Sequence, residues 1–420
     1  MKVLVCGANG FIGNAIATRL EHDGHQVVRG VRRPAHPSEI AVDYTTDVTV
    51  EQWLPKLVGI EAVINSVGII VERNGKTFDR VHTKAPIALF EACAAAGVRR
   101  VIQMSALGAE SRDTPYFASK CAADDFLLAQ PMQSYVIRAA LVYGTAGSSA
   151  SFFRTIASLP VHVLPAGGHQ LLRPIHIDDL VELVARLLVG ADDTHYPRCI
   201  EAVGRTQVSY REMLSIYRRS MGLGHAPAFG IPAWIVRSAA IAGDRIPGSM
   251  LTSDTWRMLQ RGNTADAQPI ARAIGQAPLG IERFIDPSMA PVLRADALAA
   301  WRGLLLRVAL AIVWMGSALV SAAIYPHAES LARLERLRLH GIVANVALYG
   351  ASALDFVFGA ATLLRPGRRL WLAQMSVILA YSALIAVALP EFLIDPFGPI
   401  LKNVPILAVL FLLFSEETRP

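Results

Sequence analysis

The chain has 420 residues, a formal net charge of +6 and a hydrophobic content of 53%. It contains no dense run of lysine and arginine interleaved with aromatic residues, which disfavours binding to nucleic acid. Four cysteines, Cys6, Cys93, Cys121 and Cys199, lie far apart and form no C-x-x-C pair. This pattern disfavours a metal site and is typical of small core residues in a reducing compartment.

A glycine-rich turn follows the first apolar segment, residues 2–6, and leads into a helical pattern that starts at Ile12. Glycines at this spacing allow a tight turn, a close approach of backbone to phosphate and close helix packing. The free N–H groups of the helix N-terminus then attract a pyrophosphate. We therefore expect a dinucleotide site rather than an ordinary glycine turn. Its expected residues are Gly7, Asn9, Gly10, Phe11, Ile12 and Gly13.

The end of the second predicted strand, residues 26–31, bears on the choice of cofactor. An NAD-binding turn would carry an acidic residue there, whereas this chain has Arg32 and Arg33. Two guanidinium groups suit a 2′-phosphate, which favours NADP(H), although NAD remains possible. Asp43 follows the next predicted strand and either contacts adenine or caps its loop. Ser66 and Gly68 follow the strand at 62–65, where doubly wound sheets bind ligands.

A tyrosine and a lysine four residues apart, Tyr116 and Lys120, begin another predicted helix after Pro115. Residues at this spacing share one helix face. A nearby ammonium group stabilises a phenolate, so we expect Lys120 to lower the pKa of Tyr116. The pair would then donate a proton to a carbonyl or accept one from an alcohol. Ser105, at the end of the preceding predicted strand, is a further candidate.

The order of these motifs over about residues 1–290 resembles the short-chain dehydrogenases/reductases of the extended or atypical kind. The resemblance implies that Tyr116 is the acid/base, that Lys120 holds the nicotinamide ribose and tunes the tyrosine, and that Ser105 orients the substrate. Residues 105–109 lack the Ser-Ser or Ser-Thr pair of the extended enzymes. Segments 104–109, 141–144 and 173–180 are more similar to the atypical branch that includes the accessory NADPH-binding subunit of respiratory complex I, which is a structural subunit.

The segment after the predicted sheet, about 145–290, should supply a small substrate lobe. Its Pro and Gly content near Pro227 and Pro232 predicts loops and short helices rather than another sheet. His176 is followed by Asp178 and Asp179, which favours a structural role at a helix N-terminus over a metal or proton-relay site.

Long apolar runs dominate the chain after about Trp301. Residues 308–325 contain no charge, and similar runs occupy about 341–364, 370–389 and, more briefly, 404–414. These lengths predict four membrane spans rather than a soluble bundle. Asn345 and Asp355 lie inside the second run, where a carboxylate is either a functional candidate or a neutral group bonded between helices. Residues 355–359, Gln374, Tyr381 and segment 396–405 resemble the DoxX-like four-helix membrane family.

Basic residues give the expected orientation. Arg302 and Arg307 precede the first run, and Arg365, Arg368 and Arg369 separate the second and third. These belong on the cytoplasmic side, with Glu391 and Asp395 outside, although Arg333, Arg336 and Arg338 weaken the asymmetry. Since the first strand starts at Lys2, we expect no cleavable signal peptide, a cytoplasmic N-terminal domain and insertion into the inner membrane.

The sequence thus predicts a doubly wound Rossmann-type parallel α/β sheet with a small lobe over residues 1–290, and an all-α transmembrane four-helix bundle over residues 300–420. The predicted function is a membrane-tethered NADP(H)-dependent oxidoreductase that transfers a hydride to or from a carbonyl or alcohol of an apolar substrate, such as a lipid, an isoprenoid or a quinone-related compound. Two alternatives stay open: a non-catalytic NAD(P)H-binding assembly protein, and a nucleotide-sugar epimerase or dehydratase.

Overall fold

The computed structural model describes residues 1–73, 75–190, 196–246, 249, 251–394, 398 and 400–417. Asp395, Pro396, Phe397 and Pro399, which the sequence analysis singled out, lie outside the described residues. The chain divides into two compact units, Met1–Ala297 and Leu298–Pro420. Each unit is described by itself.

The first unit is built around a seven-stranded sheet in which every described pairing is parallel. The strand order is β11-β6-β5-β4-β1-β2-β3, so the order reverses between β1 and β4. Ligands bind at such a switch point in doubly wound sheets. The strands are β1 (Lys2–Cys6), β2 (Gln26–Val31), β3 (Glu39–Ala41), β4 (Ala62–Asn65), β5 (Arg100–Ala106), β6 (Gln133–Ala139) and β11 (Cys199–Ala202).

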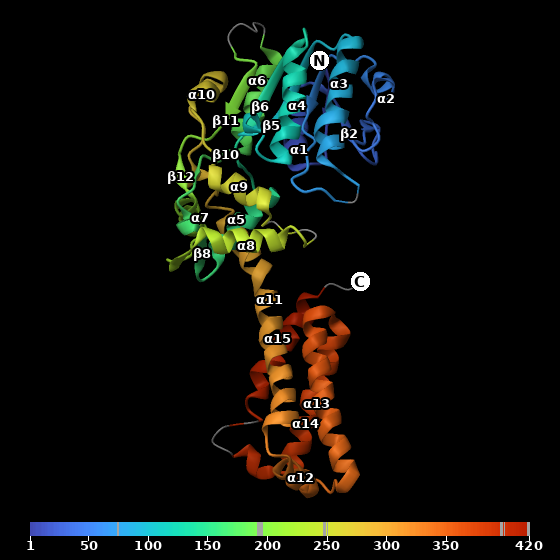
Figure 1. Cartoon of the computed structure of the whole chain (residues 1–420), viewed down its shortest axis with the longest axis vertical. Coiled ribbons are helices and arrows are strands. Elements are labelled where there is room, and N and C mark those ends of the chain that lie inside the picture. Colours follow the sequence, from blue (N-terminus) through green and yellow to red (C-terminus); the bar gives the residue numbers. More distant parts are fainter. Residues whose placement is uncertain are drawn as a thin grey trace. The chain divides into compact units, whose positions relative to one another are not determined.

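Helices cover both faces of this sheet (Figure 1). One face packs against α1 (Phe11–His22), α6 (Ile177–Val189) and α10 (Gln268–Ile274). The other packs against α2 (Val50–Trp53), α3 (Ala85–Ala95) and α4 (Pro115–Ala129). Strands buried on both faces need apolar side chains throughout, as Val3, Leu4 and Val5 of β1 illustrate with no exposed surface. The Rossmann-type α/β prediction is confirmed.

The small lobe contains short strands as well as helices, so the expectation of no further sheet is wrong. Three two-stranded sheets join β7 with β10, β8 with β13 and β9 with β12. Strands of two to four residues carry almost no sequence signal, because their pairing depends on the surrounding fold. The lobe's elements are β7 (Val142–Tyr143), α5 (Ser148–Ser158), β8 (His162–Pro165), β9 (Leu171–Leu172), β10 (Ile175–His176), β12 (Val208–Ser209), α7 (Tyr210–Ser220), β13 (Ala228–Ile231), α8 (Ala233–Gly243) and α9 (Ser253–Arg261).

The second unit is helical. Among the described residues, three helical segments are long and apolar enough to cross a membrane: Ala290–Ile324, Gly341–Leu364 and Arg368–Ala388. The fourth expected span, about 404–414, falls in a shorter apolar helix of 14 residues, α15 (Asn403–Glu416), which is not among these three. The three long segments contain α11 (Ala290–Leu319), which continues into a π-helical segment, α13 (Gly341–Leu364) and α14 (Arg368–Ala388). A short helix, α12 (His327–Arg336), lies between the first two.

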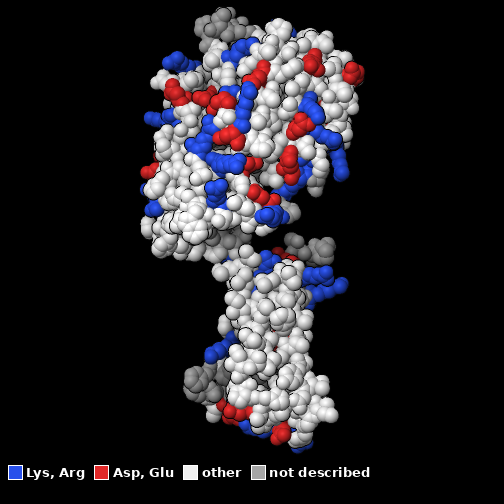
Figure 2. Space-filling model, viewed as in Figure 1, with Lys and Arg blue, Asp and Glu red and all other residues white. Residues whose placement is uncertain are grey.

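Charge is distributed in this unit as a membrane requires. Figure 2 shows its charged side chains gathered at the two ends, with a mostly uncharged band between them. Inside the bundle the Trp314 indole N–H donates to Gln374 Oε1 at 2.9 Å, and Gln374 donates in turn to Thr362 Oγ1 at 2.8 Å. By contrast, Asp355 Oδ1 is buried and has no hydrogen-bond partner within the described part of the chain.

Candidate active site

The glycine turn between β1 and α1 is shaped by contacts that leave no room for side chains. Gly7 has φ +81°, a conformation that favours glycine. A Cβ on Gly13 would lie 2.3 Å from the Gly7 carbonyl oxygen and 2.5 Å from Ser66 Oγ, and a Cβ on Gly10 would lie 3.1 Å from that same carbonyl oxygen. The turn therefore brings bare backbone to the point where β1 ends and α1 begins.

A cavity of about 290 Å³ lies beside this turn, at the carboxyl ends of β1, β2 and β4. Seven of the predicted cofactor residues line it: Gly7, Asn9, Gly10, Arg32, Asp43, Ser66 and Gly68. Its remaining walls include residues that the sequence analysis did not single out, among them Gly30, Tyr44, Thr45, Ile69 and Lys76. The structure thus places the glycine turn, which follows β1, and the turns that follow β2 and β4 around one cavity.

The other four predicted cofactor residues are not part of the cavity's lining. Phe11 and Ile12 pack against the core on the α1 face of the sheet, and the Phe11 ring also fills the space beside Gly144. Gly13 is buried in the contact between α1 and the turn. Arg33 is exposed to solvent. For these residues the structure indicates packing or solvation, and their contact with a cofactor stays a prediction.

Charged groups meet at one side of the cavity. Burial raises the pKa of Asp43, but hydrogen bonds from the Thr45 N–H and hydroxyl, with the positive charges of Arg32 and Lys76, lower it overall. The Asp43 carboxylate therefore stays ionised, and one of its oxygens accepts hydrogen bonds from its own loop. The cations Arg32 and Lys76 both line the cavity.

A buried polar network supports the floor of the site. Asn65, at the end of β4, accepts from the Tyr44 hydroxyl at 2.7 Å and donates to Gln103 Oε1 at 2.7 Å. Its Oδ1 also accepts from the Val67 N–H, which fixes the turn after β4. In the same turn Ser66 donates its hydroxyl to the Cys6 carbonyl oxygen at 2.6 Å, so that it ties β4 to the glycine turn.

Tyr116 is held at the beginning of α4. The Thr114 side chain accepts from the Phe117 N–H and Pro115 occupies the first turn, a usual start for a helix. The Tyr116 ring lies edge-on to Phe78 and His82, with ring centroids 5.8 and 5.4 Å apart. Its hydroxyl makes no hydrogen bond to the described part of the protein, so it is available to a ligand.

The expected lowering of the Tyr116 pKa is not what the structure shows. Burial, with the negative charge of Asp124, raises the pKa of Tyr116 to about 12. Lys120 does not offset this, because burial lowers its own pKa to about 8 and its ammonium group donates to the Met104 and Val67 carbonyl oxygens at 3.2 and 3.4 Å. Tyr116 is therefore protonated at neutral pH, and it is a weaker acid than a solvent-exposed tyrosine.

Lys120 reaches the cavity through Gly68. A Cβ on Gly68 would lie 3.2 Å from Lys120 Nζ, so the missing side chain leaves space for the ammonium group. Lys120 is only 5% exposed. The lysine thus lies beside the cavity wall and shares the α4 face with Tyr116, as the spacing of the pair predicts.

His82 completes the surroundings of the pair. It lies in a π-helical segment, Asp79–Lys84, which precedes α3 and resembles the bulges common at functional sites. Its Nε2 accepts from the Ile69 N–H, and its Nδ1 lies 3.0 Å from Ser119 Oγ. Burial, reinforced by the charge of Lys120, lowers the pKa of His82 to about 2. The imidazole is therefore neutral.

Ser105 faces a buried carboxylate. Its hydroxyl donates to Asp124 Oδ2 at 2.7 Å, and Arg138 Nε lies 3.3 Å from the same oxygen. Asp124 has no exposed surface, and its Oδ1 has no hydrogen-bond partner within the described residues. Burial raises the pKa of Asp124 despite these partners. The contacts of Ser105 thus favour a positioning role, and its contact with substrate stays a prediction.

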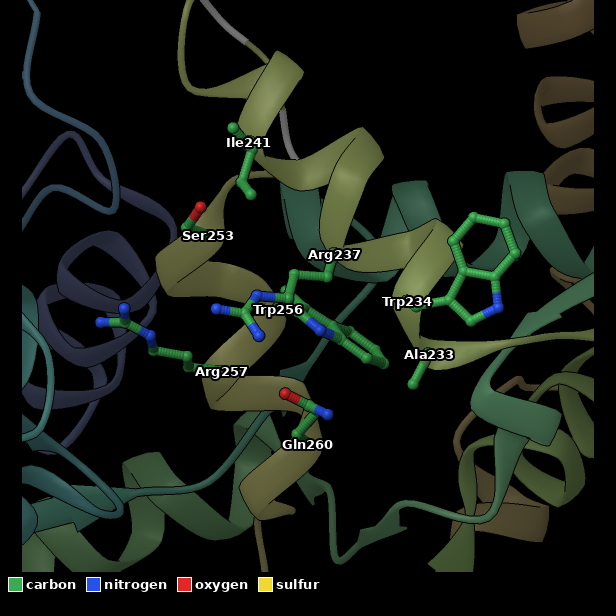
Figure 3. A pocket seen from close by; sticks show the side chains of 8 residues that line it. All are labelled: Ala233, Trp234, Arg237, Ile241, Ser253, Trp256, Arg257 and Gln260. Atoms are coloured by element: carbon green, nitrogen blue, oxygen red, sulfur yellow. The ribbon is translucent and has the colours of Figure 1, made fainter.

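A second cavity, of about 540 Å³, lies between α8 and α9 in the small lobe. Figure 3 shows Trp234 and Ile241 on α8 and Trp256 on α9, with Arg237 and Arg257 extending in the same direction. On its other side α9 approaches the candidate catalytic helix, because Met258 packs in the cluster that contains Tyr116. Arg261 of α9 also bonds Asp113, three residues before Tyr116, at 2.9 Å.

His176 has the structural role that the sequence favours. Its Nδ1 accepts from the Asp178 N–H at the start of α6, and Asp179 accepts from the Leu279 N–H at 2.8 Å. No group of His, Cys, Asp and Glu residues suited to hold a metal occurs in the parts of the chain that the structure describes.

Two matches to known families follow the same division of the chain. Residues 3–198 match the NAD dependent epimerase/dehydratase family, and residues 311–411 match the DoxX-like family. The chain therefore joins an epimerase-type, short-chain dehydrogenase/reductase-like domain to a DoxX-like one. This confirms the resemblances inferred from the sequence and associates the C-terminal segment with a lipid bilayer.

Proteins similar to this chain have differing roles. Ceramide reductase of Caulobacter vibrioides is 31% identical over 184 residues, which are 42% of this chain and 57% of that protein. Photosystem II assembly factor Ycf39 of Guillardia theta is 26% identical over 53% of this chain and 71% of its own length. Among solved structures, the Escherichia coli quinone oxidoreductase QOR2 with NADPH has a TM-score of 0.55 at 17% identity, covering 68% of this chain and 98% of that one.

Proposed function

We propose that this protein is a membrane-tethered NADP(H)-dependent oxidoreductase that reduces a carbonyl group of a lipid-like substrate. The observation that carries the proposal is that Tyr116, whose hydroxyl has no hydrogen-bond partner among the described residues, lies on the same helix face as Lys120. The Lys120 ammonium group borders the cavity beside the glycine turn through Gly68. A likeness to a ceramide reductase, which is 31% identical over 184 residues, supports this class of reaction.

The residues that line the cavity beside the glycine turn have the chemistry that binding of a dinucleotide requires. Because Gly10 and Gly13 carry no side chains, a pyrophosphate could approach the backbone N–H groups of the α1 N-terminus. Arg32 and Lys76 would hold a 2′-phosphate, which favours NADP over NAD. Asp43 would contact the adenine edge through the carboxylate oxygen that Thr45 does not use. Ser66 and Gly68 would line the path towards the nicotinamide.

Proton transfer is assigned to Tyr116. When bound, a reduced nicotinamide supplies a hydride to the carbonyl carbon of the substrate. Tyr116 donates its phenolic proton to the carbonyl oxygen, and the Lys120 ammonium group stabilises the phenolate that remains. Because the pKa of Tyr116 is about 12 in the protein alone, the phenol is protonated at neutral pH, which is the form that can donate a proton to the carbonyl oxygen. Solvent then returns the proton.

The second cavity is the proposed place for the apolar part of the substrate. Its two tryptophans and Ile241 offer apolar surface, and Arg237 and Arg257 offer charge for a polar head group. Met258 links this cavity's α9 wall to the Tyr116 cluster. A substrate with a long chain and a carbonyl close to a polar head would suit both parts.

We place the N-terminal domain on the cytoplasmic side of the inner membrane. Arg302 and Arg307 before the first apolar run, and the three arginines between the second and third, support this orientation. A cytoplasmic domain would also have access to NADP(H). A reporter that matures only in the cytoplasm, fused after Glu417, tests this orientation. Four spans would return the C-terminus to the cytoplasmic side, whereas three would not.

The proposal is tested by turnover with substrates of different chain length. The full chain, purified in mild detergent, should oxidise NADPH when given a ceramide whose hydroxyl is replaced by a ketone, and more slowly with a short soluble ketone. Tyr116→Phe should abolish this turnover while NADPH binding persists. Turnover that survives Tyr116→Phe would contradict the assignment.

An assembly role is the second candidate, because the chain is also related to a photosystem assembly factor. In that case Tyr116→Phe would leave the cellular role intact, whereas Gly10→Val, which closes the turn, would abolish it. The match to the epimerase/dehydratase family keeps a nucleotide-sugar enzyme as a third candidate. A nucleotide sugar that copurifies with the chain would favour this third candidate.

A further inference from the structure

One end of the small lobe exposes apolar side chains that a soluble surface would not carry together. Phe229 of β13 and Val163 of β8 are cross-strand neighbours and are 60% and 55% exposed. Trp234 follows on α8 and is 70% exposed. We call the set the apolar lobe surface, and its members are Val161, Val163, Phe229, Trp234, Ile235 and Ile241. In Figure 2 the region over β8 and α8 shows few charged side chains.

The helix that carries half of this surface, α8, is unusual for a soluble domain. α8 buries Val236, Ala240 and Gly243 along one face and leaves the rest of its length exposed. Its exposed part is nevertheless mostly apolar, with Arg237 and Ser238 as the polar exceptions, and α8 is one of the two shorter apolar helices among the described residues. A contiguous apolar surface of this kind marks an interaction site.

The position of this surface within the first unit identifies its partner. β8 and β13 belong to the core cluster that also contains Leu293 and Ala297, the last residues of the unit. Ser158, which ends α5 just before β8, donates its hydroxyl to the Ala297 carbonyl oxygen at 3.2 Å. The chain therefore leaves the unit next to the apolar lobe surface, and the uncharged run that begins at Val308 follows within the same helix, α11.

The chemistry of the surface suits a membrane interface. Tryptophan prefers the level of the lipid head groups, and arginines beside apolar side chains bind anionic lipids. Arg237 and Arg245 are exposed on or next to α8. The neighbouring acids are engaged, because Asp244 accepts from Ser253 and Asp254 lies 3.8 Å from Arg257.

We propose that the apolar lobe surface docks on the lipid surface of the bilayer that holds the C-terminal helices. Docking would bring the cavity between α8 and α9 to the membrane, because Trp234 and Ile241 line that cavity and also belong to the surface. An amphiphile could then pass from the bilayer into the lobe without crossing water. The docking itself does not depend on the redox function and is tested without it.

Fluorescence of Trp234 in membranes tests the proposal. The full chain is reconstituted in nanodiscs of phosphatidylcholine and phosphatidylglycerol, with ordinary or brominated acyl chains. The emission spectrum of Trp234 is obtained by subtracting the spectrum of Trp234→Phe from that of the wild type. We expect this difference to be blue-shifted and to lose most of its intensity in brominated lipid.

Two further variants keep the test independent of one substitution. Trp234→Phe/Val163→Trp places the reporter on β8 within the same surface and should be quenched in the same way. Trp234→Phe/Val58→Trp places it at a residue that is 75% exposed and lies far along the chain from the lobe, and should remain unquenched with the emission of a solvated indole.

Two results would overturn the proposal. The first is a Trp234 difference spectrum that is the same in both lipids. The second is emission that is blue-shifted yet unquenched, together with a dimer that Trp234→Asp dissociates, since the surface would then be an interface between two copies of the chain.

Discussion

The two halves of the candidate site are fixed by different physical means. Around the glycine turn, backbone geometry allows only glycine, and the cavity is lined by turns that lie at three strand ends. Around Tyr116 the backbone sets little beyond the start of α4, and burial sets the chemistry: the pKa of Lys120 falls to about 8 and that of His82 to about 2. Backbone geometry thus defines the part of the site around the glycine turn, whereas burial and charge define the part around Tyr116.

This difference predicts how each half responds to substitution. A change in the glycine turn should act on folding and cofactor binding together, because the same backbone serves both. Changes around Tyr116 should act on turnover or on its pH dependence and leave the fold largely intact. The following predictions test that contrast, beginning with the largest effect.

Gly13→Ala should be the most damaging single substitution. The new Cβ would lie 2.3 Å from the Gly7 carbonyl oxygen, and backbone cannot move aside as a side chain can. We expect a loss of about 3 kcal/mol in the free energy of unfolding, together with the loss of dinucleotide binding. Denaturant unfolding and NADPH fluorescence of the purified full chain measure the two effects.

Gly224→Ala is the matched control for this prediction, because a Cβ there meets no atom within 4 Å. Its stability should stay within about 0.5 kcal/mol of wild type. A Gly13→Ala protein that folds and binds NADPH normally would show that the turn is not the tight element described above.

Tyr116→Phe should remove turnover without removing structure. The hydroxyl has no partner among the described residues, so its loss should cost little stability, while loss of the proton donor should lower kcat by about 10²- to 10⁴-fold. Tyr210→Phe, in the core of the lobe, is the control for an aromatic substitution at a buried site. Equal losses of kcat in both variants would remove Tyr116 from the mechanism.

The pH dependence of reduction should follow Lys120. Below its pKa of about 8 the ammonium group is charged and can stabilise the phenolate, so kcat/KM should fall as the pH rises through about 8. Asp124 raises the pKa of Lys120, so Asp124→Asn should move this fall to lower pH. Profiles measured for both proteins decide the point. If the fall in kcat/KM of Asp124→Asn occurs at the same pH as in wild type or at a higher pH, Asp124 does not raise the pKa of Lys120.

The same contrast explains which parts of the fold could be predicted from the sequence. The sequence placed strands at Lys2–Cys6, Gln26–Val31 and Ala62–Asn65 with the bounds that the structure shows, because buried parallel strands and glycine turns leave local signals. Paired strands in the lobe and the π-helical segment at Asp79–Lys84 were missed, since both depend on tertiary context.

The candidate site divides similarly. The spacing of Tyr116 and Lys120 indicates a shared helix face, and Asp124, one turn further on, could have been included by the same periodicity. Burial of Asp124 and the approach of His82 from a distant segment have no local signature, and the direction of the Tyr116 pKa was predicted wrongly for that reason. Met258 comes from yet another element of the lobe.

The smallest expected effect concerns the choice between two cofactors. Arg32 and Arg33 are adjacent and equivalent in the sequence, but only Arg32 lines the cavity. An exposed guanidinium paired with a phosphate contributes about 1.5 kcal/mol, so Arg32→Ala should weaken NADPH binding roughly tenfold and leave NADH binding nearly unchanged.

Arg33→Ala, with the same change of charge one residue away, should leave both affinities near wild type. Fluorescence titration of each variant with NADPH and NADH measures the ratio directly. If the two substitutions weaken NADPH binding equally, long-range charge rather than direct contact governs the preference for NADPH over NADH. The contrast between the glycine turn, which geometry governs, and the surroundings of Tyr116, which electrostatics govern, then does not hold at this edge of the cavity. If Arg32→Ala weakens NADH as much as NADPH, the guanidinium binds a group common to both cofactors, and the assignment to the 2′-phosphate is wrong.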